Sequence, residues 1–206
     1  MENTNQNTEQ QILEVAENLF LTNGFAATST TEIAREVGCN QALIHYYFRT
    51  KDNLFNTIFE KKFKEFFEPL LDIFNNQNLS FANKLIRFIE GHFDLVSRNP
   101  RLPQLIINEI LKRPDMMDKI KEKLRPYPAR IFPEFAKELQ AEIDKGHIRP
   151  IDSVDLTMTI ISMNVSFFLF MPVVSKVIGL DEDAKKDLIA HRRPEHISFI
   201  MNSLRP

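Results

Sequence analysis

Residues 24–55 read GFAATSTTEIAREVGCNQALIHYYFRTKDNLF, and this stretch decides how the N-terminal part of the chain folds. Ser29 and Glu32 have the spacing of a capping box, in which each side chain bonds the backbone amide of the other residue. The spacing predicts a helix over residues 30–37, and Gly38 is placed to end it. The buried face of this helix is expected to consist of Ile33, Ala34 and Val37.

A second short helix is predicted directly after the turn, over residues 41–48, with Asn40 as a favourable N-cap. Ile44 and Phe48 are four residues apart, so they share one face of the helix and are expected to point inward. The opposite, outward side then carries Gln41, Ala42, His45 and Tyr46. Two short helices around a glycine-containing turn can present the second helix to the major groove of DNA.

The remainder of the chain also has the apolar spacing of helices, without the period-two pattern of a strand and without an internal repeat. A first helix is expected over 8–22, and Thr50 can cap a long helix that begins at Lys51 and continues towards Phe74. Later predicted helices span 80–98, 103–112, 115–125, about 131–145, 152–178 and 184–203. The expected fold class is all-α.

The composition is that of a soluble globular protein, with 43% hydrophobic and 26% charged residues among 206. A single cysteine, Cys39, excludes an intrachain disulfide and favours a reducing, cytoplasmic location. Its place in a turn between two helices favours an inert apolar side chain over a redox sensor. The polar N-terminal residues lack the basic and apolar regions of a secretory signal.

The charge distribution argues against a protein that binds DNA without regard to sequence. The chain carries a net charge of −2, and residues 1–54 are more acidic, with three basic and seven acidic side chains. A specific site remains compatible with this charge if a few cations and backbone amides face phosphate while the acids face away.

Residues 156–175 form a stretch of twenty residues without a formal charge, which approaches the length of a membrane span. Pro172 interrupts the stretch, and several hydroxyl and amide side chains make it polar for a span. A helix buried in a bundle or in a dimer interface explains it better, so we expect no membrane association.

Residues 9–60 resemble the DNA-binding domain of the TetR/AcrR family of bacterial transcriptional regulators. The resemblance rests on the long run GCNQALIHYYFRTKDNL at 38–54, preceded by Ala16, Leu19, Phe20, Gly24-Phe25, Thr28-Ser29 and Ile33-Ala34. Three positions depart from the family pattern: Cys39 replaces Val, His45 stands where Tyr is commonest, and Leu43 occupies a site often held by a small residue. The last two change the chemistry at or near the surface that faces DNA.

The resemblance implies an N-terminal helix-turn-helix domain over residues 1–50, joined by a long helix to a helical effector-binding and dimerisation domain over 51–206. In the DNA-binding domain, Gln41 would read a base edge, and Ala42 and Leu43 would contact thymine methyl groups. Phosphate contacts would come from Ser29, Thr30, Thr31, His45, Tyr46, Tyr47 and Lys51. Simple packing of the two tyrosines, and a purely solvated Gln41 or Lys51, are the alternatives.

For the second domain, the resemblance implies a homodimer through helices 152–178 and 184–203 and a ligand pocket in the middle helices. Residues expected to bind the ligand are Phe63, Phe66, Phe67, Phe88, His92, Phe132, Phe135, Asn164 and Phe167. Aromatic walls would suit a flat or lipophilic effector, although most of these phenylalanines could equally be ordinary core. No cofactor is expected.

The expected function is a ligand-responsive homodimeric regulator, a repressor that binds a palindromic operator and that an effector releases. A DNA-binding regulator controlled by a protein partner is the alternative. An enzyme would need a nucleophile with its base, or a metal cluster, and the sequence contains no compact motif for either. His191 and His196, with Pro194 between them, have poor spacing for a metal site.

Overall fold

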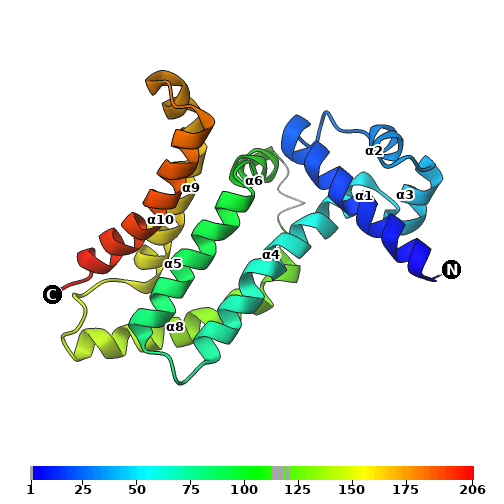
Figure 1. Ribbon diagram of the computed structural model, residues 1–206. Coiled ribbons are helices and arrows are strands. Elements are labelled where there is room, and N and C mark those ends of the chain that lie inside the picture. The colour runs from blue at the N-terminus through cyan, green and yellow to red at the C-terminus, as the bar shows by residue number, and fades with distance from the viewer. Residues whose placement is uncertain (1, 113–117, 119–120) are drawn as a thin grey trace. The chain divides into compact units, whose positions relative to one another are not determined.

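The computed structural model describes residues 2–112, 118 and 121–206, and the regular structure of these residues is entirely helical (Figure 1). The all-α prediction is therefore confirmed. The helices are α1 (Glu2–Asn23), α2 (Thr30–Val37), α3 (Gln41–Phe48), α4 (Lys51–Asn75), α5 (Phe81–Arg98), α6 (Leu102–Lys112), α8 (Pro126–Asp144), α9 (Ser153–Ile178) and α10 (Glu182–Ser203). Of the predicted helix over 115–125, residues 115–117 and 119–120 lie outside the described residues, whereas 118 and 121–124 are helical.

Two helices begin at least five residues earlier than the sequence predicts. Helix α1 starts at Glu2, not at residue 8. The prediction missed the first turns because they are polar and lack the apolar spacing of a helix. Helix α8 starts at Pro126, not near residue 131. Proline is favourable in the first turn of a helix, because the backbone amides there have no hydrogen-bond partner within the helix. Helix α9 continues through Pro172, where the sequence suggested an interruption.

The chain forms two compact units, the first comprising Met1–Lys64 and Gln104–Leu124. Its helix-turn-helix is built on an aromatic cluster: the rings of Phe20, Phe25 and Phe55 lie 4.9 to 5.6 Å apart between centroids. The other fully buried core residues here are Ile12, Ala16, Ile33, Ile44, Leu54 and Phe59. This core holds α2 and α3 in place from behind.

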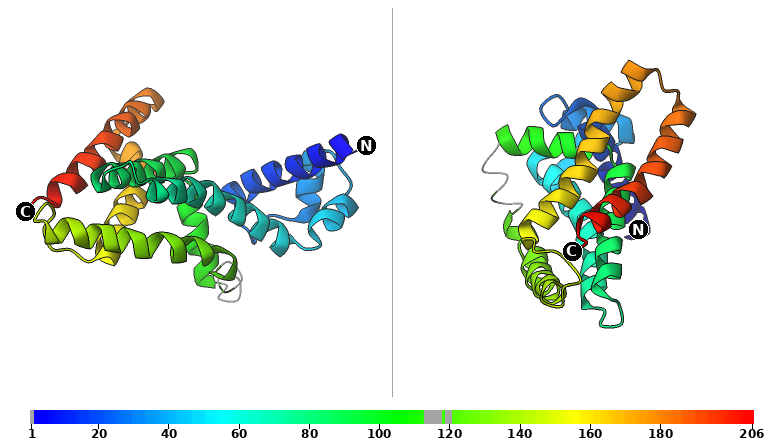
Figure 2. Two further views of the ribbon diagram at one scale, coloured as in Figure 1. Left: turned by 90° about the horizontal axis from the view of Figure 1, so that it is seen from below. Right: turned by 90° about the vertical axis from the view of Figure 1, so that its left-hand side faces the viewer.

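The second unit comprises Glu65–Pro103 and Arg125–Pro206. Helix α5 is its centre and packs against α8, α9 and α10 (Figure 2). The side chain of Arg193 on α10 forms ion pairs with Glu90 and Asp94 on α5, each at 2.8 Å. Lys84, which is only 3% exposed, pairs with Glu138 on α8 at 2.6 Å and donates to the carbonyl of Phe74.

Candidate DNA-binding surface and ligand cavity

The predicted capping box at the start of α2 is present. The Ser29 Oγ accepts from the Glu32 amide at 3.1 Å, and the Glu32 carboxylate accepts from the Ser29 amide at 3.4 Å. Gly38 ends the helix with φ of 75°, a left-handed conformation that glycine adopts without strain. The turn between α2 and α3 is therefore fixed by interactions that the local sequence specifies.

Helix α3 turns the predicted face outward. Its N-cap is Asn40, whose side chain accepts from the Ala42 amide at 2.9 Å. Ile44 and Phe48 are buried, whereas the side chains on the opposite side are exposed, namely Gln41, Ala42, His45 and Tyr46. The 65% exposure of Tyr46 shows that this ring is not core packing.

Tyr47 and Leu43 are only half-buried, so each flanks the outward face of α3 and does not project from it. The Tyr47 ring lies edge-on to Tyr46, with 5.2 Å between centroids, and also contacts Phe48. Packing thus accounts for part of the role of Tyr47. The exposed side chains of Ser29 and Thr31 and the half-buried Thr30 lie at the start of α2, whose first amides point out of the helix end.

A hydrogen bond joins the starts of the two helices. Gln41 Nε2 donates to Thr30 Oγ1 at 2.9 Å. The sequence predicts separate DNA contacts for these two side chains, but they are hydrogen-bonded to each other. Sequence reasoning missed this pair because eleven residues separate its members. The bond orients the side-chain amide of Gln41 in the absence of DNA.

Lys51 is half-buried, so it does not have the purely solvated environment that was the alternative to a phosphate contact. Its Nζ donates to the carbonyls of Phe25 and Thr28 at 2.9 and 2.8 Å and lies 4.3 Å from the centre of the Phe25 ring. Lys51 therefore ties the start of α4 to the loop before α2. Its contact with phosphate remains a prediction.

A cation that the sequence prediction omitted is Arg49, the C-cap of α3. It is exposed and has a positive φ of 65°, which is rare for a residue with a side chain. Its position next to the exposed face of α3 makes it a further candidate for phosphate contact. The feature of the sequence that could have identified Arg49 is its positive charge, because residues 1–54 contain few other basic side chains.

In the second unit, aromatic and aliphatic side chains enclose an apolar cavity of about 70 Å³. Five of the predicted ligand-binding residues line it: Phe66, Phe67, Phe88, Phe132 and Phe135. The remaining lining residues are Leu70, Phe74, Ile131, Thr157 and Ile161. Half of the residues that line this cavity were therefore among the predicted ligand-binding residues. The sequence could not show which phenylalanines line a cavity and which belong to the packed core.

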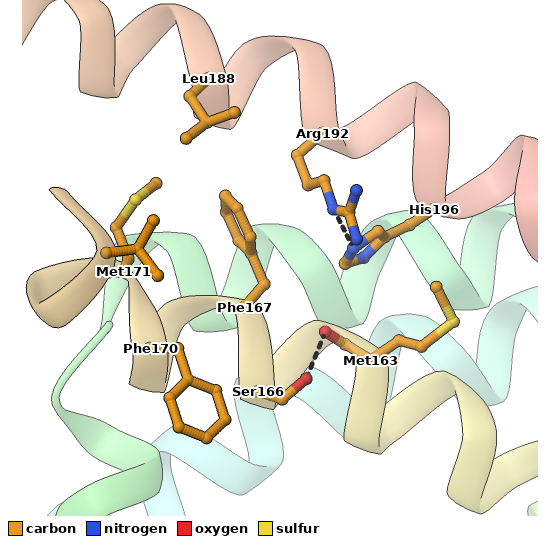
Figure 3. A pocket seen from close by; sticks show the side chains of 9 residues that line it. Met163, Ser166, Phe167, Phe170, Met171, Leu188, Arg192 and His196 are labelled. Carbon is orange, nitrogen blue, oxygen red and sulfur yellow. Dashed lines mark hydrogen bonds between the residues drawn. The ribbon is translucent and has the colours of Figure 1, made fainter. Parts of the chain in front are cut away.

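The other four predicted ligand residues do not line this cavity. Phe63 belongs to the first unit and packs near Phe59. Phe167 lines a separate groove of about 210 Å³ on α9 and α10 (Figure 3). His92 and Asn164 are buried and hydrogen-bonded to each other, beside the cavity but outside its lining.

Comparison with known proteins agrees with this geometry. Residues 12–58 match the family of bacterial regulatory proteins called the tetR family. Over 62 residues the chain is 40% identical to the HTH-type transcriptional regulator QacR of Staphylococcus aureus. The aligned segment covers 29% of this chain and 33% of QacR. Over 120 residues it is 25% identical to the fatty acid metabolism regulator protein of Bacillus subtilis, covering 57% of this chain and 60% of that protein. Both matches span less than two thirds of the relative.

The fold extends the likeness over the whole chain. The solved structure of FadR from Bacillus subtilis in complex with stearoyl-CoA has a TM-score of 0.63 with this protein, at 18% identity, and covers 95% of this chain and 99% of that one. A likeness at this identity concerns the fold alone. Over residues 12–58 the chain is therefore similar to bacterial regulatory proteins of the tetR family, and both relatives named above are themselves regulators.

Proposed function

We propose that this protein is a cytoplasmic, homodimeric repressor that binds a palindromic operator through α3 and is released by a small lipophilic effector. The observation that carries the DNA-binding part is the face of α3, which is exposed and polar while Ile44 and Phe48 anchor its back. A recognition helix needs both properties, because base edges are read by side chains held at fixed positions. Gln41, in its first turn, would pair with adenine N6 and N7.

Dimerisation through α9 and α10 is supported by a stripe of exposed apolar side chains. On α9 the exposed residues are Val154, Met158, Phe170, Val173, Val174, Val177 and Ile178, and on α10 Phe199 joins them. The residues from 170 to 178 recur at helical spacing, so they form one continuous face. A face of this kind is typical of a buried interface, and a second copy would supply the two-fold symmetry that a palindrome requires.

The same stripe bears on the membrane alternative. Helix α9 is long and apolar enough, by length and composition, to cross a membrane, with a mean hydropathy of 1.7 and 22% of that window buried within the chain. We attribute its exposed apolar face to the dimer interface. Asn164, a polar side chain with 0% exposure, lies in the middle of α9 and bonds to α5 and α10, as expected for a helix packed in a protein bundle.

The effector part rests on the apolar cavity and its aromatic wall. The cavity of about 70 Å³ is smaller than ligand pockets of about 300–1,000 Å³, so we infer that the effector enlarges it by displacing lining side chains. A lipophilic effector is further supported by the similarity to the fatty acid metabolism regulator and by the shared fold of the stearoyl-CoA complex of FadR.

Helix α4 is the element through which such a displacement would reach the DNA-binding domain. Lys51 at its first residue bonds the carbonyls of Phe25 and Thr28, whereas Phe66 and Phe67 further along the same helix line the cavity. A shift of α4 by the effector would change the position of α2 and α3. Release follows if the effector binds the shifted state more tightly than the DNA-bound state.

Control by a protein partner remains the alternative, and one experiment separates the two. DNA bound by the purified protein is selected from a random pool, and the enriched sequence is then titrated with 2-octanone and octanoyl-CoA as lipophilic probes. Enrichment of a palindrome supports a dimeric reader, and release by either probe supports the effector. No enrichment overturns operator binding, whereas enrichment without release by lipophilic compounds favours the protein partner.

A further inference from the structure

Four polar side chains, of which Arg192 is exposed and His196, Asn164 and His92 are buried, form a hydrogen-bonded relay between the groove on α9 and α10 and the aromatic wall of the cavity. Arg192 Nε donates to His196 Nε2 at 2.7 Å (Figure 3). His196 Nδ1 lies 2.7 Å from Asn164 Oδ1. Asn164 Nδ2 in turn lies 3.1 Å from His92 Nδ1 and donates to the carbonyl of Ile89 at 3.2 Å. The first bond joins two turns of α10, the second joins α10 to α9, and the third joins α9 to α5.

The direction of every hydrogen bond in this relay is fixed by the guanidinium of Arg192, which can only donate. His196 Nε2 must therefore accept, so the proton of the neutral ring is on Nδ1 and is donated to the Asn164 oxygen. The Asn164 amide then presents its NH₂ group to two acceptors, the Ile89 carbonyl and His92 Nδ1. As a result, the neutral His92 ring carries its proton on Nε2.

The ring of His92, which carries the remaining donor Nε2–H, is next to the cavity wall. His92 follows Phe88 by one helical turn on α5, and its ring lies 5.5 Å from that of Phe66 at an angle of 71°. Phe66 and Phe88 both line the cavity. Among the hydrogen bonds of the described residues, none involves His92 Nε2. In this described part of the chain, the buried side-chain atoms without a hydrogen-bond partner are Asn56 Oδ1 and Glu60 Oε1, so His92 Nε2 retains some contact with solvent.

We propose that His92 is the polar anchor of the effector site and that the effector carries a neutral carbonyl oxygen on an apolar body. The proposal rests on the effector cavity proposed above. The relay makes His92 Nε2 a donor that cannot become an acceptor, and so selects an acceptor on the ligand. Displacement of Phe66, one of the lining side chains that the proposed effector would move, would bring the ligand to this donor.

A neutral carbonyl is preferred to a carboxylate because no cation is among the described residues that line the cavity. Arg192 stands at the far end of the relay, two side chains away from His92. A carboxylate without a cationic partner is costly to bury. Burial also lowers the pKa of His92 to about 4, so that the ring is uncharged at neutral pH and offers a hydrogen bond without a charge.

Three probes of nearly equal shape test the anchor on the full-length protein: acetophenone, α-methylstyrene and benzoate. The first two differ by C=O against C=CH₂, and benzoate adds the charge. Ligand-observed NMR gives the three affinities, and ¹⁵N spectra of the histidine rings report the His92 nitrogens. We expect acetophenone to bind about three- to tenfold more tightly than α-methylstyrene, and more tightly than benzoate.

The variant His92→Phe should abolish the preference for acetophenone, and the exposed His147→Phe should retain it. Saturable but equal binding of acetophenone and α-methylstyrene would overturn the anchor while leaving the cavity intact. Failure of all three probes to bind would overturn the cavity as well. Tighter binding of benzoate would overturn the choice of a neutral carbonyl.

A second measurement keeps the test decisive if His92→Phe does not fold. In the unaltered protein, the ¹⁵N spectrum should show His92 protonated on Nε2 and His196 on Nδ1. Acetophenone should shift the His92 Nε2 resonance, and α-methylstyrene should leave it in place. The opposite tautomer of His92, or no difference between the probes, contradicts the proposal.

Discussion

Gln41, the first residue of α3, donates from its side-chain amide to the hydroxyl of Thr30, the first residue of α2, at 2.9 Å. The bond links the starts of the two helices that form the helix-turn-helix. It uses the Nε2 of Gln41, and no hydrogen bond among the described residues uses its Oε1. Thr30 thus positions the side chain that we expect to read DNA.

Gln41→Ala should relax the sequence preference of the protein and leave its stability nearly unchanged. The amide is exposed, so loss of its bond to Thr30 is expected to lower the free energy of unfolding by about 0.5 kcal/mol at most. Loss of a bidentate contact to a base should reduce discrimination at one position by about 1–3 kcal/mol. Competition binding with single-base variants of the selected operator measures this effect.

Thr30→Val serves as the partner variant, because it removes the hydroxyl and retains the shape of the side chain. It should weaken the same base preference by less than Gln41→Ala, since Gln41 remains but is no longer oriented. An unchanged preference in Gln41→Ala would show that another residue of α3 reads the base.

Lys51→Met should both destabilise the first unit and weaken binding to all DNA sequences alike. The variant retains an apolar stem over the Phe25 ring and removes the ammonium that bonds two backbone carbonyls. Hydrogen bonds from charged groups suggest a loss of about 1.5–3 kcal/mol in the free energy of unfolding. If the ammonium also contacts phosphate, the salt dependence of binding should flatten by about one unit.

Lys137→Met is the control for Lys51→Met, because Lys137 is an exposed lysine of the second unit. It should change neither the unfolding free energy nor the salt dependence of DNA binding. A stability loss in Lys51→Met with an unchanged salt slope would assign Lys51 a purely structural role.

The stability of the protein should fall as the pH is lowered from 6.5 towards 4. Burial lowers the pKa of His92 to about 4, and burial together with the charge of Arg192 lowers the pKa of His196 to about 4, from an ordinary value of 6.5. In this window the unfolded chain binds more protons than the folded one, so acid favours unfolding. Each histidine contributes a slope of up to about 1.4 kcal/mol per pH unit, and this contribution fades as the pH rises above 6.5.

Urea unfolding at pH 7.0, 6.0 and 5.0 measures this slope. In His92→Phe one of the two buried imidazoles is gone, so the slope between pH 6.0 and 5.0 should decrease by about half. A slope that is identical in the variant and in the unaltered protein would show that His92 is protonated with an ordinary pKa in the folded state.

Val177→Asp should convert the proposed dimer into a monomer. Val177 is 78% exposed in the single chain and belongs to the apolar stripe of α9, so a carboxylate there would be buried without a partner if two copies meet on this face. Sedimentation velocity measures the change in mass. Asn83→Asp, which adds the same charge at an exposed position of α5, should leave the dimer intact. A dimeric Val177→Asp would place the interface elsewhere.

The local sequence was sufficient for the helix-turn-helix. The capping box of Ser29 and Glu32, the left-handed Gly38 and the Asn40 cap are interactions between residues at most three positions apart, or conformations of one residue. The outward face of α3 likewise followed from the helical period, because Ile44 and Phe48 share one side. The phenylalanines of the cavity were found by type and spacing, but the same signal also selected Phe63, which lies in the other unit.

Tertiary structure alone decided which polar groups meet. The carbonyl partners of Lys51 lie 23 and 26 residues away, and Asn164 is separated from His92 by 72 residues and from His196 by 32. Such contacts depend on the crossing of helices that are distant in the chain, and no periodicity within one helix encodes that crossing. The sequence therefore determined the helices and the face presented to DNA, whereas packing determined how Lys51 is held and where the His92 donor is placed.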